Sequence, residues 1–129
     1  MRQGHGERTT ALVVDDFASI RALLTVILER RYDCEVVAQA GNAECARVSF
    51  LQCCPDLVTL DLNLEDNEGL EVLDDLMLIN PEARVVIITA ENDPDLLRAV
   101  LAKGATAVVS KPIQFTYLDA AMQRAMTES

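Results

Sequence analysis

The sequence predicts an α/β domain with a doubly wound parallel sheet, in which five strands and five helices alternate. Two observations predict this class. Short apolar runs recur at near-even spacing, and the segments between them have helical periodicity. No linker, repeat or low-complexity segment interrupts the 129 residues, so one domain is expected. Strict alternation of this kind favours right-handed crossovers with helices on both faces of the sheet.

Five apolar runs predict the strands. Four of them are nearly continuous rather than alternating, which is typical of strands buried on both faces of a parallel sheet. The second run contains Glu35 and is expected at an edge of the sheet. The expected strands cover residues 10–14, 34–38, 57–60, 84–88 and 106–110.

Apolar stripes predict four of the helices, and their Met and aromatic members are expected in the core. The stripes are Phe17, Ile20, Leu23, Leu24, Ile27 and Leu28; Leu70, Leu73, Leu76 and Met77; Leu97, Val100 and Leu101; and Phe115, Leu118, Met122, Ala125 and Met126. A fifth helix over 42–54 is predicted to start at Asn42 as N-cap and to stop before Pro55. Asp93 and Pro94 predict the start of the helix that follows the fourth strand.

Composition narrows the class of partner. The net charge of −10 argues against a nucleic-acid backbone or an anionic membrane, because both need a cationic patch. It favours a metal cation or a basic partner surface. The N-terminus has no apolar core typical of a signal peptide, and no apolar run is long enough to span a bilayer. We expect a cytoplasmic monomer or weak dimer, whose four cysteines are free and mostly buried thiols.

Polar side chains stand where the predicted strands end. The first strand ends in Asp15 and Asp16, the third in Asp61, the fourth in Thr89, and the fifth runs into Lys111. Doubly wound sheets bind ligands beyond these carboxyl ends, and the strand order 2-1-3-4-5 makes strands one and three neighbours. Taken alone, each residue has an ordinary explanation, such as Asp16 capping a helix. Together they predict one site.

The chemistry of such a site is specific. Two carboxylates about 4 Å apart repel by roughly 4 kcal/mol at an effective dielectric constant near 20. A hard divalent cation relieves this repulsion, and Mg²⁺ typically binds one or two carboxylates together with a phosphate. We therefore expect removal of Asp15 or Asp16 to stabilise the metal-free protein. With a carboxylate as nucleophile, the Thr89 hydroxyl and the Lys111 ammonium can hold phosphoryl oxygens, which suits formation of an aspartyl phosphate.

These motifs resemble the response-regulator receiver family of two-component signalling. The segments are "VVDD" at 13–16, "LDLNL" at 60–64, "IITA" at 87–90 and "SKP" at 110–112, and the resemblance extends from about Ala11 to Met126. It is closest in form to stand-alone receivers of the chemotaxis-regulator kind. It implies a flavodoxin-like fold and a cis Lys111–Pro112 peptide.

The resemblance also implies a role for each site residue. Asp61 is the implied phosphoacceptor and, with Asp16, a direct Mg²⁺ ligand. Asp15 would act through a water molecule, and the Asn63 carbonyl would complete the ligand set. Thr89 and Lys111 would bind the phosphoryl group. The implied phosphodonor is a histidine kinase or phosphotransfer protein, and the signal would pass by contact to a downstream protein, with no nucleic acid or membrane involved.

Two positions depart from the family pattern. Glu65 stands where receivers often have proline, and Val108 stands where they usually have the Tyr or Phe that swings inward on activation. A receiver-like scaffold that signals without phosphorylation is therefore an alternative. A phosphatase with an aspartyl nucleophile is a third, disfavoured by Asn63 at the position of the second aspartate. We expect no enzyme activity beyond self-phosphorylation and autodephosphorylation.

The expected domain organisation is simple. Residues 1–9 are predicted to form a flexible tail and residues 10–127 the receiver domain, with no output domain in this chain.

Overall fold

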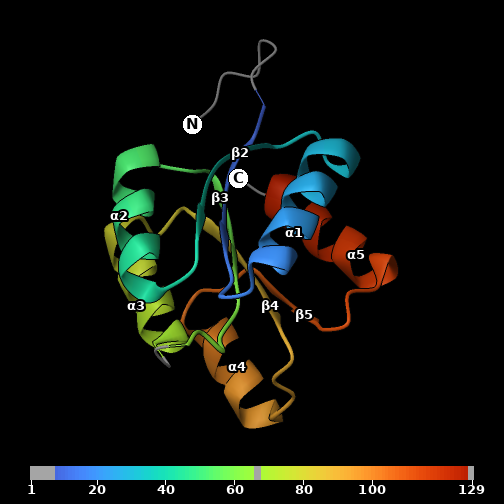
Figure 1. Ribbon diagram of the computed structural model, residues 1–129. Helices are drawn as coiled ribbons and strands as arrows, with labels where there is room; N and C mark the ends of the chain where they lie inside the picture. Colours follow the sequence, from blue (N-terminus) through green and yellow to red (C-terminus); the bar gives the residue numbers. More distant parts are fainter. Residues whose placement is uncertain (1–7, 66–67, 128–129) are drawn as a thin grey trace.

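The computed structural model describes residues 8–65 and 68–127, and within them five strands alternate with five helices (Figure 1). The elements are β1 Thr10–Val14, α1 Ala18–Arg31, β2 Glu35–Ala40, α2 Ala43–Cys53, β3 Leu57–Leu60, α3 Gly69–Ile79, β4 Arg84–Thr89, α4 Pro94–Ala102, β5 Ala107–Ser110 and α5 Phe115–Thr127. Each predicted strand and helix is present, with bounds that differ by a few residues at most.

The sheet is parallel and has the order β2-β1-β3-β4-β5, which confirms the predicted topology. The strand that carries Glu35 lies at an edge, as expected, and the Glu35 side chain is exposed. In the centre, Val14 of β1 lies opposite Leu60 of β3, and Leu60 lies opposite Ile87 of β4. This register brings the ends of β1 and β3 to the same level.

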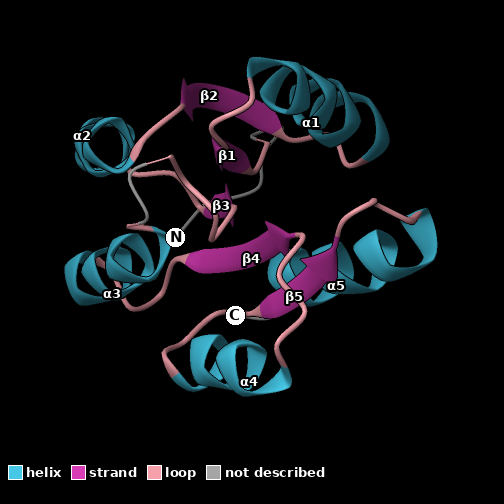
Figure 2. Cartoon of the chain, turned by 60° about the horizontal axis from the view of Figure 1, so that its bottom comes forward, coloured by secondary structure: helices cyan, strands magenta, loops and turns pink. Residues whose placement is uncertain are grey.

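Helices cover both faces of the sheet. α1 and α5 lie on one face, and α2, α3 and α4 lie on the other (Figures 1 and 2). Successive residues of a strand enter opposite layers, so Leu12 belongs to the core under α2 and α3, whereas Val13 belongs to the core under α1 and α5. Because the central strands are buried on both sides, their sequences are continuous apolar runs.

The predicted helix starts are confirmed by their hydrogen bonds. The Asn42 side chain accepts a hydrogen bond from the Cys45 N–H at 2.8 Å, and Asp93 accepts one from the Asp95 N–H at 3.0 Å. Pro94 occupies the first turn of α4. α2 ends at Cys53, and the next residue, Cys54, takes a left-handed backbone conformation with φ 47° before Pro55.

Some of the predicted core positions are wrong. Phe17 is 64% exposed, because it precedes the first turn of α1 and its ring does not share the face that buries Leu24 and Leu28. Phe115, the first residue of α5, is also exposed, and its ring is covered by the Arg31 guanidinium at 4.2 Å from the centroid. Leu23 and Leu101 are likewise exposed.

The prediction for the cysteines is right about pairing and wrong about burial. All four thiols are free, but only Cys34 is buried. Burial raises the pKa of the Cys34 thiol to about 11. Cys45, Cys53 and Cys54 are exposed, because they lie on the outer side and at the end of α2 rather than against the sheet.

The expected flexible tail lies mostly outside the described residues, which begin at Arg8. Thr9 is already attached to the sheet, since its carbonyl accepts a hydrogen bond from the Glu35 N–H at 2.8 Å. In the described part of the chain, no helix combines the length and the apolar character needed to cross a membrane.

Candidate functional site

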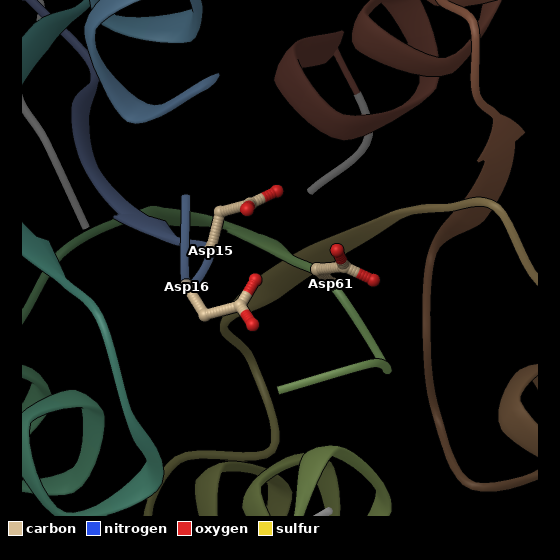
Figure 3. A group of neighbouring side chains, drawn as sticks. All are labelled: Asp15, Asp16 and Asp61. Carbon is tan, nitrogen blue, oxygen red and sulfur yellow. The ribbon is translucent and has the colours of Figure 1, made fainter. Parts of the chain in front are cut away.

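Asp15, Asp16 and Asp61 meet at the carboxyl ends of β1 and β3 (Figure 3). One carboxylate oxygen from each lies within 4.8 Å of the others. The backbone holds them there, because the Asp61 N–H donates to the Val14 carbonyl at 3.1 Å and the Asp15 N–H donates to the Ala40 carbonyl at 3.1 Å. The side chains of Asp15 and Asp61 are almost fully buried. The predicted convergence of these three acids is therefore present.

Lys111 supplies a positive charge to two of the three acids. Its Nζ lies 2.7 Å from Asp15 Oδ2 and 2.7 Å from Asp61 Oδ2. Burial on its own would lower the pKa of Lys111, but the hydrogen bonds to Asp15 and Asp61 outweigh burial and raise it, so the ammonium stays charged. The peptide between Lys111 and Pro112 is cis, as the family resemblance implies.

This contact revises the expectation of three uncompensated carboxylates. Asp15 Oδ2 binds the Lys111 ammonium and Asp15 Oδ1 accepts a hydrogen bond from the Phe17 N–H at 3.0 Å. Asp61 Oδ1 accepts one from the Asn63 N–H at 2.9 Å. Removing Asp15 would therefore break favourable contacts, and only removal of Asp16 is now expected to stabilise the metal-free protein.

Lys111 forms ion pairs with Asp15 and Asp61, and Asp16 feels its charge without such a contact. Asp16 Oδ1 is buried and has no hydrogen-bond partner, a condition that only one other side-chain oxygen in the described residues shares, Thr59 Oγ1. Burial raises the pKa of Asp16, and the charges of Asp15 and Asp61 raise it further. The Asp16 side chain does not cap α1, whose first turn has no side-chain cap. The Asp16 carboxylate contributes one oxygen to the acid cluster (Figure 3).

Thr89 and Asn63 border the cluster. Thr89 is fully buried at the end of β4, its hydroxyl accepts a hydrogen bond from the Glu91 N–H at 3.2 Å, and its carbonyl accepts one from the Lys111 N–H at 2.9 Å. Asn63 is exposed two residues after Asp61. Glu65 lies in an exposed turn, and Asp66 lies outside the described residues.

Two residues that support the site were not predicted. Gly69 begins α3 against the backbone of Leu62, and a Cβ at this position would lie 2.2 Å from the Leu62 carbonyl oxygen. Arg21 donates from Nη1 to the Asp15 carbonyl at 2.7 Å. Periodicity could not reveal Arg21, since a cation in the first turns of a helix is ordinary on a solvated face. The glycine in "NEGLEVL", soon after Asp61, was the available signal for Gly69.

The residues present fit a hard divalent cation. Each of the three carboxylates offers one oxygen, these oxygens lie within 4.8 Å of one another, and Asp16 carries a buried oxygen without a hydrogen-bond partner. Mg²⁺ prefers oxygen ligands of this kind, and a site with open positions can also accept a phosphate. The Lys111 ammonium adds a second centre of positive charge beside Asp61. The arrangement can therefore bind a phosphoryl group between a metal ion and an ammonium group.

Comparison with known proteins gives one consistent family. The family model of the response regulator receiver domain matches residues 11–123. Chemotaxis protein CheY of Listeria monocytogenes is 32% identical over 114 residues, which are 88% of this chain and 95% of that protein. A protein-glutamate methylesterase/protein-glutamine glutaminase of Agrobacterium fabrum is 38% identical over 102 residues, which are 78% of this chain but 29% of that protein. The chain thus spans less than a third of the length of such methylesterases.

Solved structures agree with the sequence comparison. The CheX–CheY complex with BeF₃ and Mg²⁺ from Borrelia burgdorferi contains a chain that superposes with a TM-score of 0.85 at 25% identity, covering 92% of this chain and 90% of that one. The response regulator domain of Thermotoga maritima CheB gives a TM-score of 0.79 at 25% identity, covering 95% and 100%.

Proposed function

The chain belongs to the response regulator receiver domain family of two-component signalling, and on that premise we propose that it is a phosphoacceptor. It takes a phosphoryl group from a histidine kinase or phosphotransfer protein onto Asp61, in a reaction that requires Mg²⁺. One observation carries this proposal. The Asp61 carboxylate is held by the Lys111 ammonium at 2.7 Å, beside the unpartnered Asp16 oxygen.

The transfer is a displacement at phosphorus. An Asp61 oxygen forms the new O–P bond, the P–N bond to the donor imidazole breaks, and the imidazole nitrogen leaves with the electron pair and takes a proton. Charge that develops on the phosphoryl oxygens is neutralised by Lys111, and the Thr89 hydroxyl donates a hydrogen bond to one of them. Burial of Asp61 strengthens these interactions, because water screens them weakly.

Asp16 and Asp61 would hold the metal ion directly, Asp15 would hold it through a water molecule, and the Asn63 carbonyl would complete the protein ligands. When bound, the ion neutralises phosphoryl oxygens and orients them for in-line attack. The orphaned Asp16 Oδ1 supports this assignment, since a buried carboxylate oxygen without a donor is costly unless a cation satisfies it.

The partners are proteins. The relative from Borrelia burgdorferi was solved with CheX, and we propose that this chain likewise signals by contact with a downstream protein. The relay operates in the cytoplasm, and the chain turns over no external substrate beyond self-phosphorylation and autodephosphorylation. The methylesterase activity named for the longer relatives is not proposed for these residues, which match less than a third of such proteins.

One observation keeps the scaffold alternative in view. Val108 is a half-buried valine in β5, and it borders a hollow of about 340 Å³ together with Ser110, Lys111, Gln114 and Tyr117. A valine has no ring to move into or out of this hollow, so the usual route from the site to the surface is altered. Phosphorylation chemistry does not depend on Val108.

Binding of beryllofluoride tests the proposed site, because this anion mimics a phosphoryl group on a carboxylate. With Mg²⁺, ¹⁹F NMR should show a bound beryllofluoride signal in the parent and none in Asp61→Asn. Asp75→Asn is the matched control, since it changes an acid of α3 outside the cluster, and its signal should persist. A bound signal that survives Asp61→Asn would show that the anion is held elsewhere.

A further inference from the structure

A groove with apolar walls lies between α2 and α3. Its volume is about 260 Å³, and its lining consists of Arg47, Leu51, Asp75, Leu78 and Ile79. The apolar side chains are open to water: Leu78 is 86% exposed, Leu51 58% and Ile79 44%. Single exposed apolar residues are ordinary, but three that line one hollow form a contiguous apolar patch, which typically marks an interaction surface.

The groove is remote from the acid cluster. Leu51 lies near the C-terminal end of α2, and Leu78 and Ile79 form the C-terminal end of α3. These helices lead into the beginnings of β3 and β4, whereas Asp61 and Thr89 stand where those strands end. The groove and the phosphoryl site therefore lie at opposite edges of the sheet.

The two helices that form the groove carry four acids and one base, although the charged residues of the lining itself, Arg47 and Asp75, pair with each other. Arg47 is the single base of α2 and α3, and its guanidinium already binds Asp75 at 2.6 Å and Glu68 at 3.1 Å. Exposed Glu82 follows the C-terminal end of α3 and adds a negative charge there, while Lys103 offsets Asp74.

The helix ends add to this negative charge. Neither α2 nor α3 has a basic residue in its last turn, so the carbonyl ends of both helix dipoles lack compensation from their own side chains. Both of these helix ends lie beside the groove residues Leu51, Leu78 and Ile79.

We propose that this groove docks a cationic amphipathic helix of a partner protein. The apolar stripe of such a helix would pack on Leu51, Leu78 and Ile79, as helices do in hydrophobic grooves. Its Lys and Arg side chains would lie beside Asp75 and the carbonyl ends of α2 and α3. A second copy of this chain fits less well than a cationic helix, because its own α2 and α3 carry four acids and a single base.

The position of the groove gives the docking a distinct role. Since no groove residue contacts Asp15, Asp16 or Asp61 through a described hydrogen bond or ion pair, the bound helix need not respond to the state of Asp61. The groove would hold the chain to its partner before and after phosphorylation. This inference is independent of the proposed function, because it requires no phosphoryl transfer.

A designed peptide tests the proposal on the full chain. The probe is a fluorescein-labelled 18-residue helix with Leu along one face and Lys on the other, and its binding is followed by fluorescence anisotropy. Leu51→Ser combined with Leu78→Ser should weaken binding at least about tenfold, as expected for central apolar anchors. Leu23→Ser, at a comparably exposed position on α1, is the matched control and should change binding by no more than about twofold.

Further experiments test whether the bound helix must be cationic and whether the occupant is a partner protein. A peptide with Glu in place of Lys should not bind, added salt should weaken the Lys peptide, and Asp61→Asn should bind it like the parent. Equal loss in Leu23→Ser, or equal binding of the Glu peptide, overturns the proposal. Two other results would also overturn it. If sedimentation shows a dimer that Leu78→Ser abolishes, the occupant is a second copy of this chain. If the protein binds anionic vesicles and Leu78→Ser abolishes that binding, the occupant is a membrane.

Discussion

The Lys111 ammonium lies 2.7 Å from the Asp61 carboxylate, and the side chains are only 18% and 5% exposed. The same nitrogen binds Asp15 at the same distance. The sequence led us to expect that only Mg²⁺ relieves the repulsion among the carboxylates. In the metal-free protein, the Lys111 ammonium already relieves part of it. Asp16 forms no ion pair with Lys111, so a bound cation would stabilise Asp16 more than the other two acids.

Lys111→Met should destabilise the metal-free protein strongly. The change leaves two buried carboxylates without their cation, and breaking a buried ion pair in this way typically costs about 3–5 kcal/mol. The free energy of unfolding in urea measures the effect. Adding Asp61→Asn to Lys111→Met should recover part of the loss, because one of the stranded charges is removed.

A matched control for this experiment is Lys103→Met. The Lys103 ammonium binds Asp74 at 3.1 Å, but both side chains are well exposed. An exposed pair contributes about 0–1 kcal/mol, so its loss should be small. Equal costs for Lys103→Met and Lys111→Met would mean that burial of the Lys111 pair has no energetic importance.

Asp16→Asn should stabilise the metal-free protein and abolish its response to Mg²⁺. The raised pKa of Asp16 means that the folded state holds this proton more tightly than the unfolded state. Below the ordinary pKa of Asp, Asp16 is protonated in both states. As the pH rises from this value through the raised pKa of the folded state, the unfolded state loses its proton first, so the folded state loses stability. At higher pH the ionised Asp16 destabilises the fold. Melting temperatures of parent and Asp16→Asn, with and without Mg²⁺, check this.

The advantage of Asp16→Asn over the parent should grow from acidic to neutral pH and shrink when Mg²⁺ is added, since a cation that binds only the folded state stabilises it by mass action. If the melting temperature of the parent does not change on addition of millimolar Mg²⁺ at constant ionic strength, the assignment of Asp16 as a metal ligand is contradicted.

Gly69→Ala should destabilise the fold and weaken the site together. The added Cβ would lie 2.2 Å from the Leu62 carbonyl oxygen, so the backbone of the loop after Asp61 must shift. We expect a loss of about 2–4 kcal/mol in urea unfolding, together with a weaker Mg²⁺ response. A mild Gly69→Ala variant with normal Mg²⁺ binding would argue against a role for this close contact.

Coupling from Asp61 to the surface of α4, β5 and α5 should be modest. Val108 has a stiff β-branched side chain and no ring that can exchange positions, so we expect a coupling free energy of about 1 kcal/mol or less, against a typical 1–3. Amide chemical shifts with beryllofluoride and Mg²⁺ should change most over residues 90–94 at the start of α4. Val108→Tyr should enlarge the changes around β5. Shifts in the parent that are already largest at Val108 would show that the ring is dispensable.

Much of the fold could be predicted because its signals are local. Continuous apolar runs mark strands buried on both faces, and Asn42 and Asp93 cap their helices as their residue types favour. The errors concern four apolar stripe members, Phe17, Leu23, Leu101 and Phe115, and the exposed thiols in and just after α2. There an apolar residue type was taken to imply burial, whereas burial depends on which side of a helix packs against the sheet.

The sequence allowed us to predict which residues form the site, but not all of the contacts between them. Strand topology alone brings Asp15, Asp16 and Asp61 together, since their positions follow from where β1 and β3 end. The contact of Lys111 with two of them depends on a side-chain conformation that no spacing encodes. The support from Arg21 and Gly69 likewise depends on tertiary contacts.

The central claim is that Asp61 accepts a phosphoryl group, and intact-mass measurement after incubation with acetyl phosphate and Mg²⁺ tests it most directly. The parent should gain one phosphoryl group that is labile to base, whereas Asp61→Asn, or the parent without Mg²⁺, should gain none. Modification that persists in Asp61→Asn would contradict the account. So would an unmodified parent under conditions in which it binds Mg²⁺, and that result would favour a receiver-like scaffold that signals without phosphorylation.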